Sequence, residues 1–165
     1  MTEEVLLHYS AKPLGPLVSK KQIDLRFLYD KPKGLWVSVR GKDDWENWCR
    51  GESFGDIDKQ RCYRVSLTDD ANILRIRTAD ELDSFSQKYG MDLGHGLQRN
   101  GIDWARVAKE YQGIIIAPYI WSRRLNGPSS DWYYGWDCAS GCIWDVSAIA
   151  GVTINYQTEE LENVR

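Results

Sequence analysis

The sequence predicts a single α+β domain. Its 165 residues match the usual size of one domain, and a chain of that length can bury a core without disulfides or a metal. Hydrophobic residues make up 42% and charged residues 27%, as in ordinary globular proteins. Short apolar strands and amphipathic helices follow one another with neither a repeat nor a linker. We therefore expect one domain over 1–165, with a core over 1–157 and a frayed tail over 158–165.

Alternating apolar residues predict the strands. In Leu35–Val39 the apolar residues at odd positions share one face, whereas Trp36 and Ser38 share the other. The turn Thr68–Asn72 predicts that the strands on its two sides form an antiparallel pair. The expected strands are Glu4–Ser10, Ile23–Leu28, Leu35–Val39, Gln60–Leu67, Ile73–Arg77, Ile114–Ala117, Asp131–Asp137, Cys142–Val146 and Val152–Tyr156.

Caps and apolar stripes predict three helices. Asp43 or Asp44 begins the first, which runs through Cys49, because an Asp oxygen accepts the free N–H groups of a first turn. Thr78–Glu81 fits a capping box at the start of the second, whose apolar stripe extends to Tyr89. The expected third helix is Ile102–Tyr111, and the expected loops are Ala11–Pro16, Gly90–Gly101 and Pro118–Ser130.

Charge and composition exclude several classes of protein. The net charge of −3 carries no block of like charge, which argues against a basic face for duplex nucleic acid. The chain lacks the apolar run of about 18 residues that a membrane span needs, and its acidic start is unlike a signal peptide. We expect a cytoplasmic protein without membrane contact. The cysteines do not form Cys-x-x-Cys pairs, so we expect free thiols and no metal site.

Two of the early strands carry side chains suited to a flat, hydroxyl-bearing ligand. His8, Tyr9 and Ser10 place hydrogen-bonding groups on a rigid strand, where they can hold a ribose hydroxyl or an amide. Trp36 and Ser38 share one strand face, so a ring can stack on a base while a hydroxyl bonds beside it. Each group also has an ordinary structural reading as part of a sheet.

The late segment Trp132–Gly141 combines four aromatic rings with one carboxylate, Asp137. An acid in this setting can stabilise an oxocarbenium ion or activate a nucleophile, although it can equally be a turn residue. Cys138 is a conceivable nucleophile, but no His stands at a familiar spacing from it.

Together these segments resemble the ADP-ribosyltransferase superfamily in its His–Tyr–Glu branch, which includes diphtheria toxin and the poly-ADP-ribose polymerases. The matching segments are Leu7-His-Tyr-Ser10, Gly34-Leu-Trp-Val-Ser38 with the aromatic helix after it, Tyr111-Gln-Gly-Ile-Ile-Ile116, and Ser140-Gly-Cys-Ile-Trp-Asp-Val-Ser-Ala-Ile149. The resemblance spans most of the chain in the right order. It implies split, mostly antiparallel β-sheets with a few peripheral helices.

The resemblance also implies an activity, the transfer of ADP-ribose from NAD to an acceptor. His8, Tyr9 and Ser10 would hold the ribose, and Trp36, Ser38 and Trp45 would surround the nicotinamide; Trp36 stands where the family has a tyrosine. The family's catalytic Glu falls near Ser140, and Asp137 is the acid three residues earlier. The expected catalytic residues are Asp137, Ser140 and His8.

The sequence does not indicate whether the acceptor is a protein or a nucleic acid. It also does not distinguish among toxin, defence and regulatory roles. The resemblance assigns acceptor recognition to the loop Tyr119–Ser130. A second interpretation is a binding module that holds a nucleotide or a partner protein without turnover, because Ser140 is not acidic. A third is a nucleic-acid-acting protein in which Trp121, Arg123 and Arg124 hold a single strand.

Overall fold

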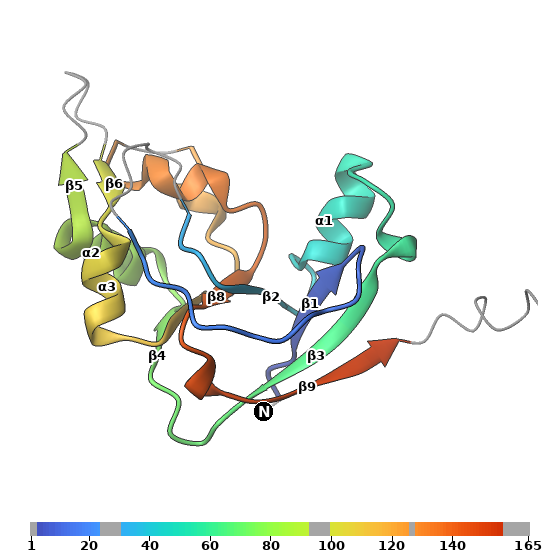
Figure 1. Ribbon diagram of the computed structural model, residues 1–165. Coiled ribbons are helices and arrows are strands. Elements are labelled where there is room, and N and C mark those ends of the chain that lie inside the picture. Colours follow the sequence, from blue (N-terminus) through green and yellow to red (C-terminus); the bar gives the residue numbers. More distant parts are fainter. Residues whose placement is uncertain (1–2, 24–30, 93–99, 126–127, 157–165) are drawn as a thin grey trace, which may run out of the picture.

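The computed structural model describes residues 3–23, 31–92, 100–125 and 128–156. It forms one α+β domain, built on a large and mostly antiparallel sheet (Figure 1). The strands are β1 Leu6–Ser10, β2 Leu35–Val39, β3 Arg61–Leu67, β4 Ile73–Ile76, β5 Gly90–Asp92, β6 Asn100–Ile102, β7 Gly113–Ile116, β8 Ser140–Ile143 and β9 Ile149–Tyr156. The α-helices are α1 Trp45–Glu52, α2 Ala79–Tyr89 and α3 Trp104–Glu110.

The large sheet consists of two halves that meet along a short seam. Its strand order is β4-β7-β8-β2-β1-β3-β9. β2 pairs with β8 over four residue pairs, and β1 pairs with β3 over five. The contact between β1 and β2, in contrast, has only two pairs, Leu6↔Val39 and Leu7↔Ser38. Contrary to what the resemblance implies, the large sheet is therefore not split into separate sheets; its seven strands form one sheet that opens beyond Leu7.

Local sequence explains where the first two helices begin. The Asp44 side chain accepts the N–H of Asn47, so Asp44 is the N-cap of α1 as expected. Thr78 and Glu81 form the full capping box of α2, each side chain bonding the other's backbone N–H. These bonds join residues close in sequence, which is why the sequence predicts them correctly.

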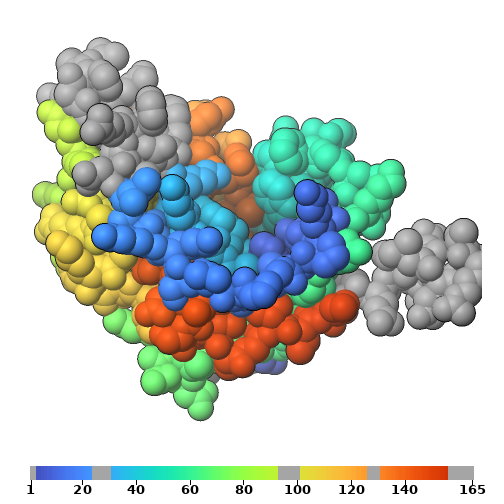
Figure 2. All heavy atoms as spheres, in the orientation of Figure 1, coloured from blue at the N-terminus to red at the C-terminus, as the bar shows by residue number. Residues whose placement is uncertain are grey.

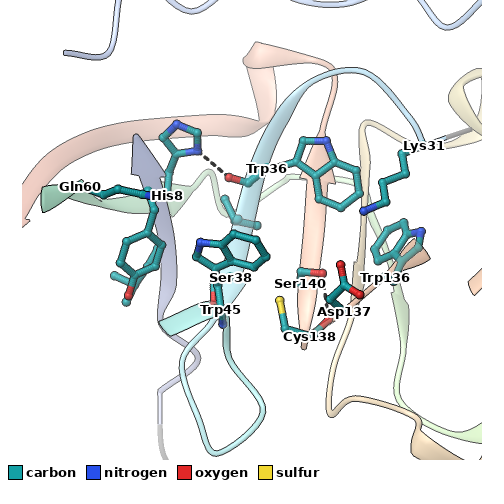
Figure 3. Close-up of a pocket in the computed structure, with 13 residues that line it drawn as sticks. His8, Lys31, Trp36, Ser38, Trp45, Gln60, Trp136, Asp137, Cys138 and Ser140 are labelled. Atoms are coloured by element: carbon teal, nitrogen blue, oxygen red, sulfur yellow. Dashed lines mark hydrogen bonds between the residues drawn. The ribbon is translucent and has the colours of Figure 1, made fainter. Parts of the chain in front are cut away.

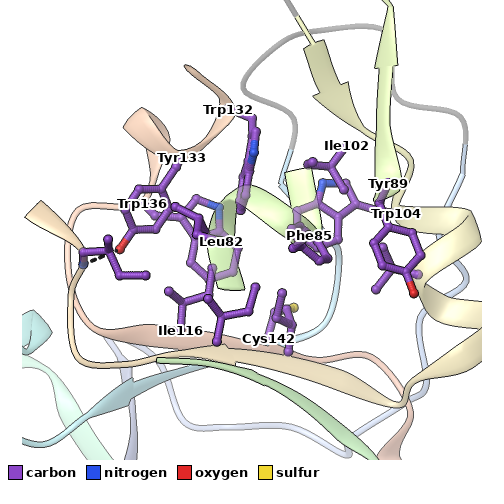
Figure 4. Close-up of a cluster of buried hydrophobic side chains, with 14 of the residues drawn as sticks. Leu82, Phe85, Tyr89, Ile102, Trp104, Ile116, Trp132, Tyr133, Trp136 and Cys142 are labelled. Atoms are coloured by element: carbon purple, nitrogen blue, oxygen red, sulfur yellow. Dashed lines mark hydrogen bonds between the residues drawn. The ribbon is translucent and has the colours of Figure 1, made fainter. Parts of the chain in front are cut away.

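Two apolar clusters lie on opposite faces of the sheet. The larger one contains the buried sides of α2 and α3 and several aromatic rings, which pack on Ile114, Ile116 and Cys142 of the sheet (Figure 4). The smaller one, around Leu6, Val37 and Ile115, is covered in part by Leu14 and Leu17. Leu14 and Leu17 belong to the segment 11–22, which crosses the front of the molecule in Figure 2.

The prediction that the strands around Thr68–Asn72 pair with each other is wrong. β3 pairs with β1 and β9, whereas β4 lies at the far edge of the sheet and pairs in parallel with β7. The turn therefore connects β3, which lies next to the edge strand β9, to β4 at the opposite edge of the sheet. A parallel partner for β4 requires a crossover connection, and α2 and α3 supply it on one face.

Other boundaries also differ from expectation. The expected aromatic strand Asp131–Asp137 is wrong, because Pro128–Gly135 is a 3₁₀ helix that contributes the rings of Trp132 and Tyr133 to the larger cluster. The expected loop Gly90–Gly101 contains two paired strands, β5 and β6, at its ends. α3 begins two residues later than predicted, and β8 is shifted toward the N-terminus. β9 begins three residues earlier than predicted and ends at Tyr156 as expected. Residues 24–28 of the expected strand Ile23–Leu28 and the tail 158–165 lie outside the described residues, and Ile23 is not part of a strand.

None of the described helices combines the length and the apolar character required to cross a membrane. All four cysteines are buried and free of disulfides, as expected. Within the described ranges, no three His, Cys, Asp or Glu side chains come together in the way metal ligands would.

Candidate functional site

A cavity of about 350 Å³ opens where β1 and β2 separate (Figure 3). Pockets of this size are within the range of small-molecule and cofactor sites. One wall comes from β1 and the start of α1, and the other from the chain that leads into β8. The lining residues are Leu7, His8, Tyr9, Lys31, Trp36, Val37, Ser38, Trp45, Gln60, Trp136, Asp137, Cys138 and Ser140.

His8 bridges the opening between the two strands. Its Nδ1 lies 2.7 Å from the backbone oxygen of Trp36, which belongs to β2 beyond the last β1–β2 pair. A carbonyl oxygen can only accept, so Nδ1 carries the proton in this bond. Nε2 of the ring is left for a ligand, and in the neutral ring it is an acceptor. The separation of the strands thus gives His8 both a fixed orientation and a free polar atom.

Aromatic rings form the apolar part of the pocket. Trp36 packs edge-on against Trp136, with 4.9 Å between the ring centroids. Trp45 stacks on Trp48 at 5.0 Å with an interplanar angle of 16°. These contacts restrain Trp36 and Trp45 without covering them completely, because both rings still line the cavity. A flat ligand can stack on rings held in this way.

Asp137 is the only carboxylate among the described residues that line the cavity. Its side chain is 30% exposed and lies 3.8 Å from a guanidinium nitrogen of Arg124. That guanidinium is also above the rings of Tyr119, Trp121 and Tyr134. Asp137 therefore presents a solvent-accessible negative charge to the pocket, next to a restrained positive charge.

Two serine hydroxyls of the pocket are already engaged within the protein. Ser140 is buried, and its Oγ donates to the backbone oxygen of Cys138 at 2.9 Å. Ser38 is also buried, and its Oγ accepts the backbone N–H of Trp45 at 2.9 Å. The Ser38 bond ties β2 to the first residue of α1, so it positions Trp45 at the rim of the cavity.

Cys138 is not poised for nucleophilic attack. Its thiol is buried in the pocket wall, and this burial raises its pKa to about 12. Because the thiolate is the nucleophile, a thiol with such a pKa stays neutral and unreactive near pH 7. Burial likewise raises the pKa of the Tyr9 phenol, whose hydroxyl donates to Glu46 at 3.4 Å. Both groups act as neutral parts of the wall.

The structure brings most of the sequence-predicted site residues together. The predicted residues that line the pocket are His8, Tyr9, Trp36, Ser38, Trp45, Asp137 and Ser140. Ser10 does not line it; its hydroxyl donates to the backbone oxygen of Lys12 at 2.7 Å, in the loop after β1. Alternation along the strand predicts that Ser10 and His8 share one strand face. The turn that follows the strand instead directs the Ser10 hydroxyl to the Lys12 carbonyl.

Among the polar and aromatic lining residues, Lys31, Gln60 and Trp136 were not predicted as site residues from the sequence. Trp136 belongs to the aromatic segment before β8. The sequence indicates that this segment is rich in rings, but it does not indicate which of the rings lines a pocket. Lys31 and Gln60 had no local signal, because they enter the pocket from the segments before β2 and β3. Of the loop cations, Arg123 forms two bonds of 2.7 Å with Asp83, away from the lining.

No protein-family model matches this chain, and neither a curated protein nor a solved structure matches it with significance.

Proposed function

We propose that the protein binds NAD in the cavity between β1 and β2 and transfers its ADP-ribose to a macromolecular acceptor, releasing nicotinamide. One observation carries this proposal. The separation of the strands brings His8, Trp36 and Asp137, which come from distant parts of the sequence, to a single cavity. A group that can hydrogen-bond a ribose hydroxyl, a stacking ring and an accessible carboxylate are the groups that this chemistry requires.

Each group has a distinct role in the proposed reaction. Nε2 of His8 bonds a hydroxyl of the nicotinamide ribose, since Nδ1 is held by the Trp36 carbonyl. Trp36 and Trp45 provide ring faces for the nicotinamide. Asp137 stabilises the positive charge that develops on the ribose as the bond to nicotinamide breaks.

The proposed transfer requires no reagent other than NAD and the acceptor. The N-glycosidic bond breaks, and its electron pair leaves with nicotinamide, which becomes neutral. A nucleophilic group of the acceptor then forms a bond to the anomeric carbon and loses a proton to solvent. Water in place of the acceptor would give free ADP-ribose. The acceptor is a protein or a nucleic acid, and the loop after Tyr119, beside Asp137, is where we expect it to approach.

A second function is favoured by one specific contact. Ser140, at the position where the resembling family has its Glu, is buried and its hydroxyl is bonded to the Cys138 carbonyl. If Asp137 does not replace that Glu, the same cavity would bind a nucleotide without turnover. The protein would then be a nucleotide-binding module.

Proton NMR of NAD with the purified protein tests both functions. NAD signals that broaden while free nicotinamide accumulates over hours would support the transferase or its hydrolytic side reaction. Broadened signals without nicotinamide, even when a cell extract supplies acceptors, would favour the binding module. Sharp and unchanged NAD signals at millimolar concentration would contradict both.

A further inference from the structure

A positive charge lies in the cavity. Lys31 is the only cationic side chain among the described residues that line it. Its Nζ lies above the Trp36 ring, 5.4 Å from the ring centroid, and Figure 3 shows its side chain beside Trp36 and Trp136. No described carboxylate forms an ion pair with it. Among the described residues, the charge of Lys31 is therefore held at the pocket by an aromatic ring and not by an ion pair.

Other groups that bind anions are already engaged near the pocket. Arg124 faces Asp137, and Arg123 faces Asp83. The N-terminus of α1 offers little, because the N–H groups of Trp45 and Asn47 are bonded to Ser38 and Asp44. An anionic ligand that enters this cavity therefore finds its counter-charge on Lys31.

We propose that Lys31 binds a phosphate group of the ligand, so that the cavity selects phosphate-bearing nucleotides over unphosphorylated nucleosides. An ammonium–phosphate hydrogen bond is charge-assisted on both sides, whereas an ammonium at an exposed ring makes a weak contact. Transfer of the ammonium from Trp36 to a phosphate is thus favourable. The same movement uncovers a face of the Trp36 ring on which the base of the ligand stacks.

This inference deepens the proposed function, because it rests on the same cavity and names the part of NAD that Lys31 recognises. It also extends beyond NAD. A pyrophosphate within a dinucleotide and a phosphate monoester on a mononucleotide share the chemistry that Lys31 recognises. Binding assays with NAD, ADP-ribose and AMP distinguish these sources from each other.

Calorimetric titration of the whole chain tests the assignment. NAD, ADP-ribose, AMP and nicotinamide riboside are titrated into the wild type and the Lys31→Gln, Lys31→Arg and Lys33→Gln variants. Lys33 is the matched control, since it is exposed on the same segment and does not line the cavity. We expect Lys31→Gln to weaken binding of NAD and ADP-ribose by about tenfold, as for the loss of a charge-assisted hydrogen bond.

The other pairs of ligand and variant test whether the effect of Lys31 is specific to phosphate. Nicotinamide riboside, which carries no phosphate, should bind Lys31→Gln at least as tightly as the wild type, because no phosphate draws Lys31 away from the Trp36 ring. Lys31→Arg should retain most of the affinity for phosphate-bearing ligands, and Lys33→Gln should match the wild type. Equal weakening of NAD and nicotinamide riboside in Lys31→Gln would overturn the proposal, because that pattern reports damage to the stacking surface.

The inference and the proposed function can fail separately. If NAD is bound and nicotinamide is released but Lys31→Gln behaves as the wild type, the phosphate assignment is wrong and the activity stands. If AMP binds in a Lys31-dependent manner while NAD neither binds nor reacts, the assignment stands and the proposed function falls. If no phosphate-bearing ligand binds the wild type, both are wrong.

Discussion

His8 donates a hydrogen bond from Nδ1 to the backbone oxygen of Trp36, 2.7 Å away, across the point where β1 and β2 separate. This bond satisfies a carbonyl that lies beyond the last pair of the β1–β2 seam. It also fixes the ring so that Nε2 is available to a ligand. The His8 side chain thus links β1 to β2 where the strands separate, and it also lines the cavity.

His8→Ala should remove NAD-dependent stabilisation and lower the free energy of unfolding by about 1 kcal/mol, the usual net value of a hydrogen bond. Thermal unfolding with and without millimolar NAD measures both effects. Ser10→Ala is the matched control, because Ser10 lies on the same strand but not on the cavity lining. It should keep the full NAD-dependent shift. An unchanged shift in His8→Ala would contradict the assigned role.

Asp137→Asn should lower the rate of nicotinamide release by about 10²- to 10³-fold while NAD affinity stays near that of the wild type, because the carboxylate acts on charge that exists only in the transition state. Rates come from proton NMR, and affinities from calorimetry. Asp131→Asn, in the preceding 3₁₀ helix and outside the cavity lining, should behave as the wild type. A full rate in Asp137→Asn would exclude Asp137 as the group that stabilises the transition state.

Ser140→Ala should lower stability by about 1 kcal/mol, since the buried carbonyl of Cys138 loses its donor. Nicotinamide release should be unchanged, because the Ser140 hydroxyl is directed at that carbonyl. Urea denaturation and the NMR rate assay measure the two effects. A variant with native stability and a reduced rate would restore Ser140 as a catalytic residue.

Gly141→Ala should destabilise the sheet by about 1–3 kcal/mol, the usual cost of overpacking. A Cβ at Gly141 would collide with the Ile114 carbonyl and would lie 2.7 Å from Cγ1 of Ile115. The backbone cannot retreat, because Gly141 pairs with a strand on each side. Gly151→Ala on β9, where a Cβ would meet nothing within 4 Å, is the control and should change stability by less than about 0.5 kcal/mol. Equal urea midpoints for the two variants would contradict this packing.

Burial of Cys138 should make stability fall at alkaline pH. Its pKa is raised by burial from 9.0 to about 12. Because the folded state keeps a proton that the unfolded state releases, the contribution is complete below about pH 9 and is lost progressively toward about pH 12. The slope from this one group approaches about 1.4 kcal/mol per pH unit.

Cys138→Ala should therefore lose stability less steeply than the wild type as the pH rises. Urea unfolding under reducing conditions, repeated from neutral pH to about pH 10.5, measures the two slopes. Parallel slopes would mean that the Cys138 thiol ionises as readily in the folded protein as in the unfolded chain.

The sequence by itself determined the features that depend on neighbouring residues. The caps at Asp44 and Thr78 bond groups within three residues, and the alternation in Leu35–Val39 assigns its two faces. The side chains of His8 and Trp36 have the hydrogen-bonding and stacking chemistry that suits a nucleotide, whatever the fold around them. Such properties belong to short stretches of chain, so they can be predicted before any fold is known.

Only the tertiary structure decided how these stretches meet. The parallel pairing of β4 with β7, the two-pair seam between β1 and β2 and the burial of Ser140 depend on segments distant in sequence. Lys31 enters the cavity for the same reason. Pairing partners and burial follow from which apolar faces cover one another across the whole domain, and no local hydrogen bond or alternation encodes that choice.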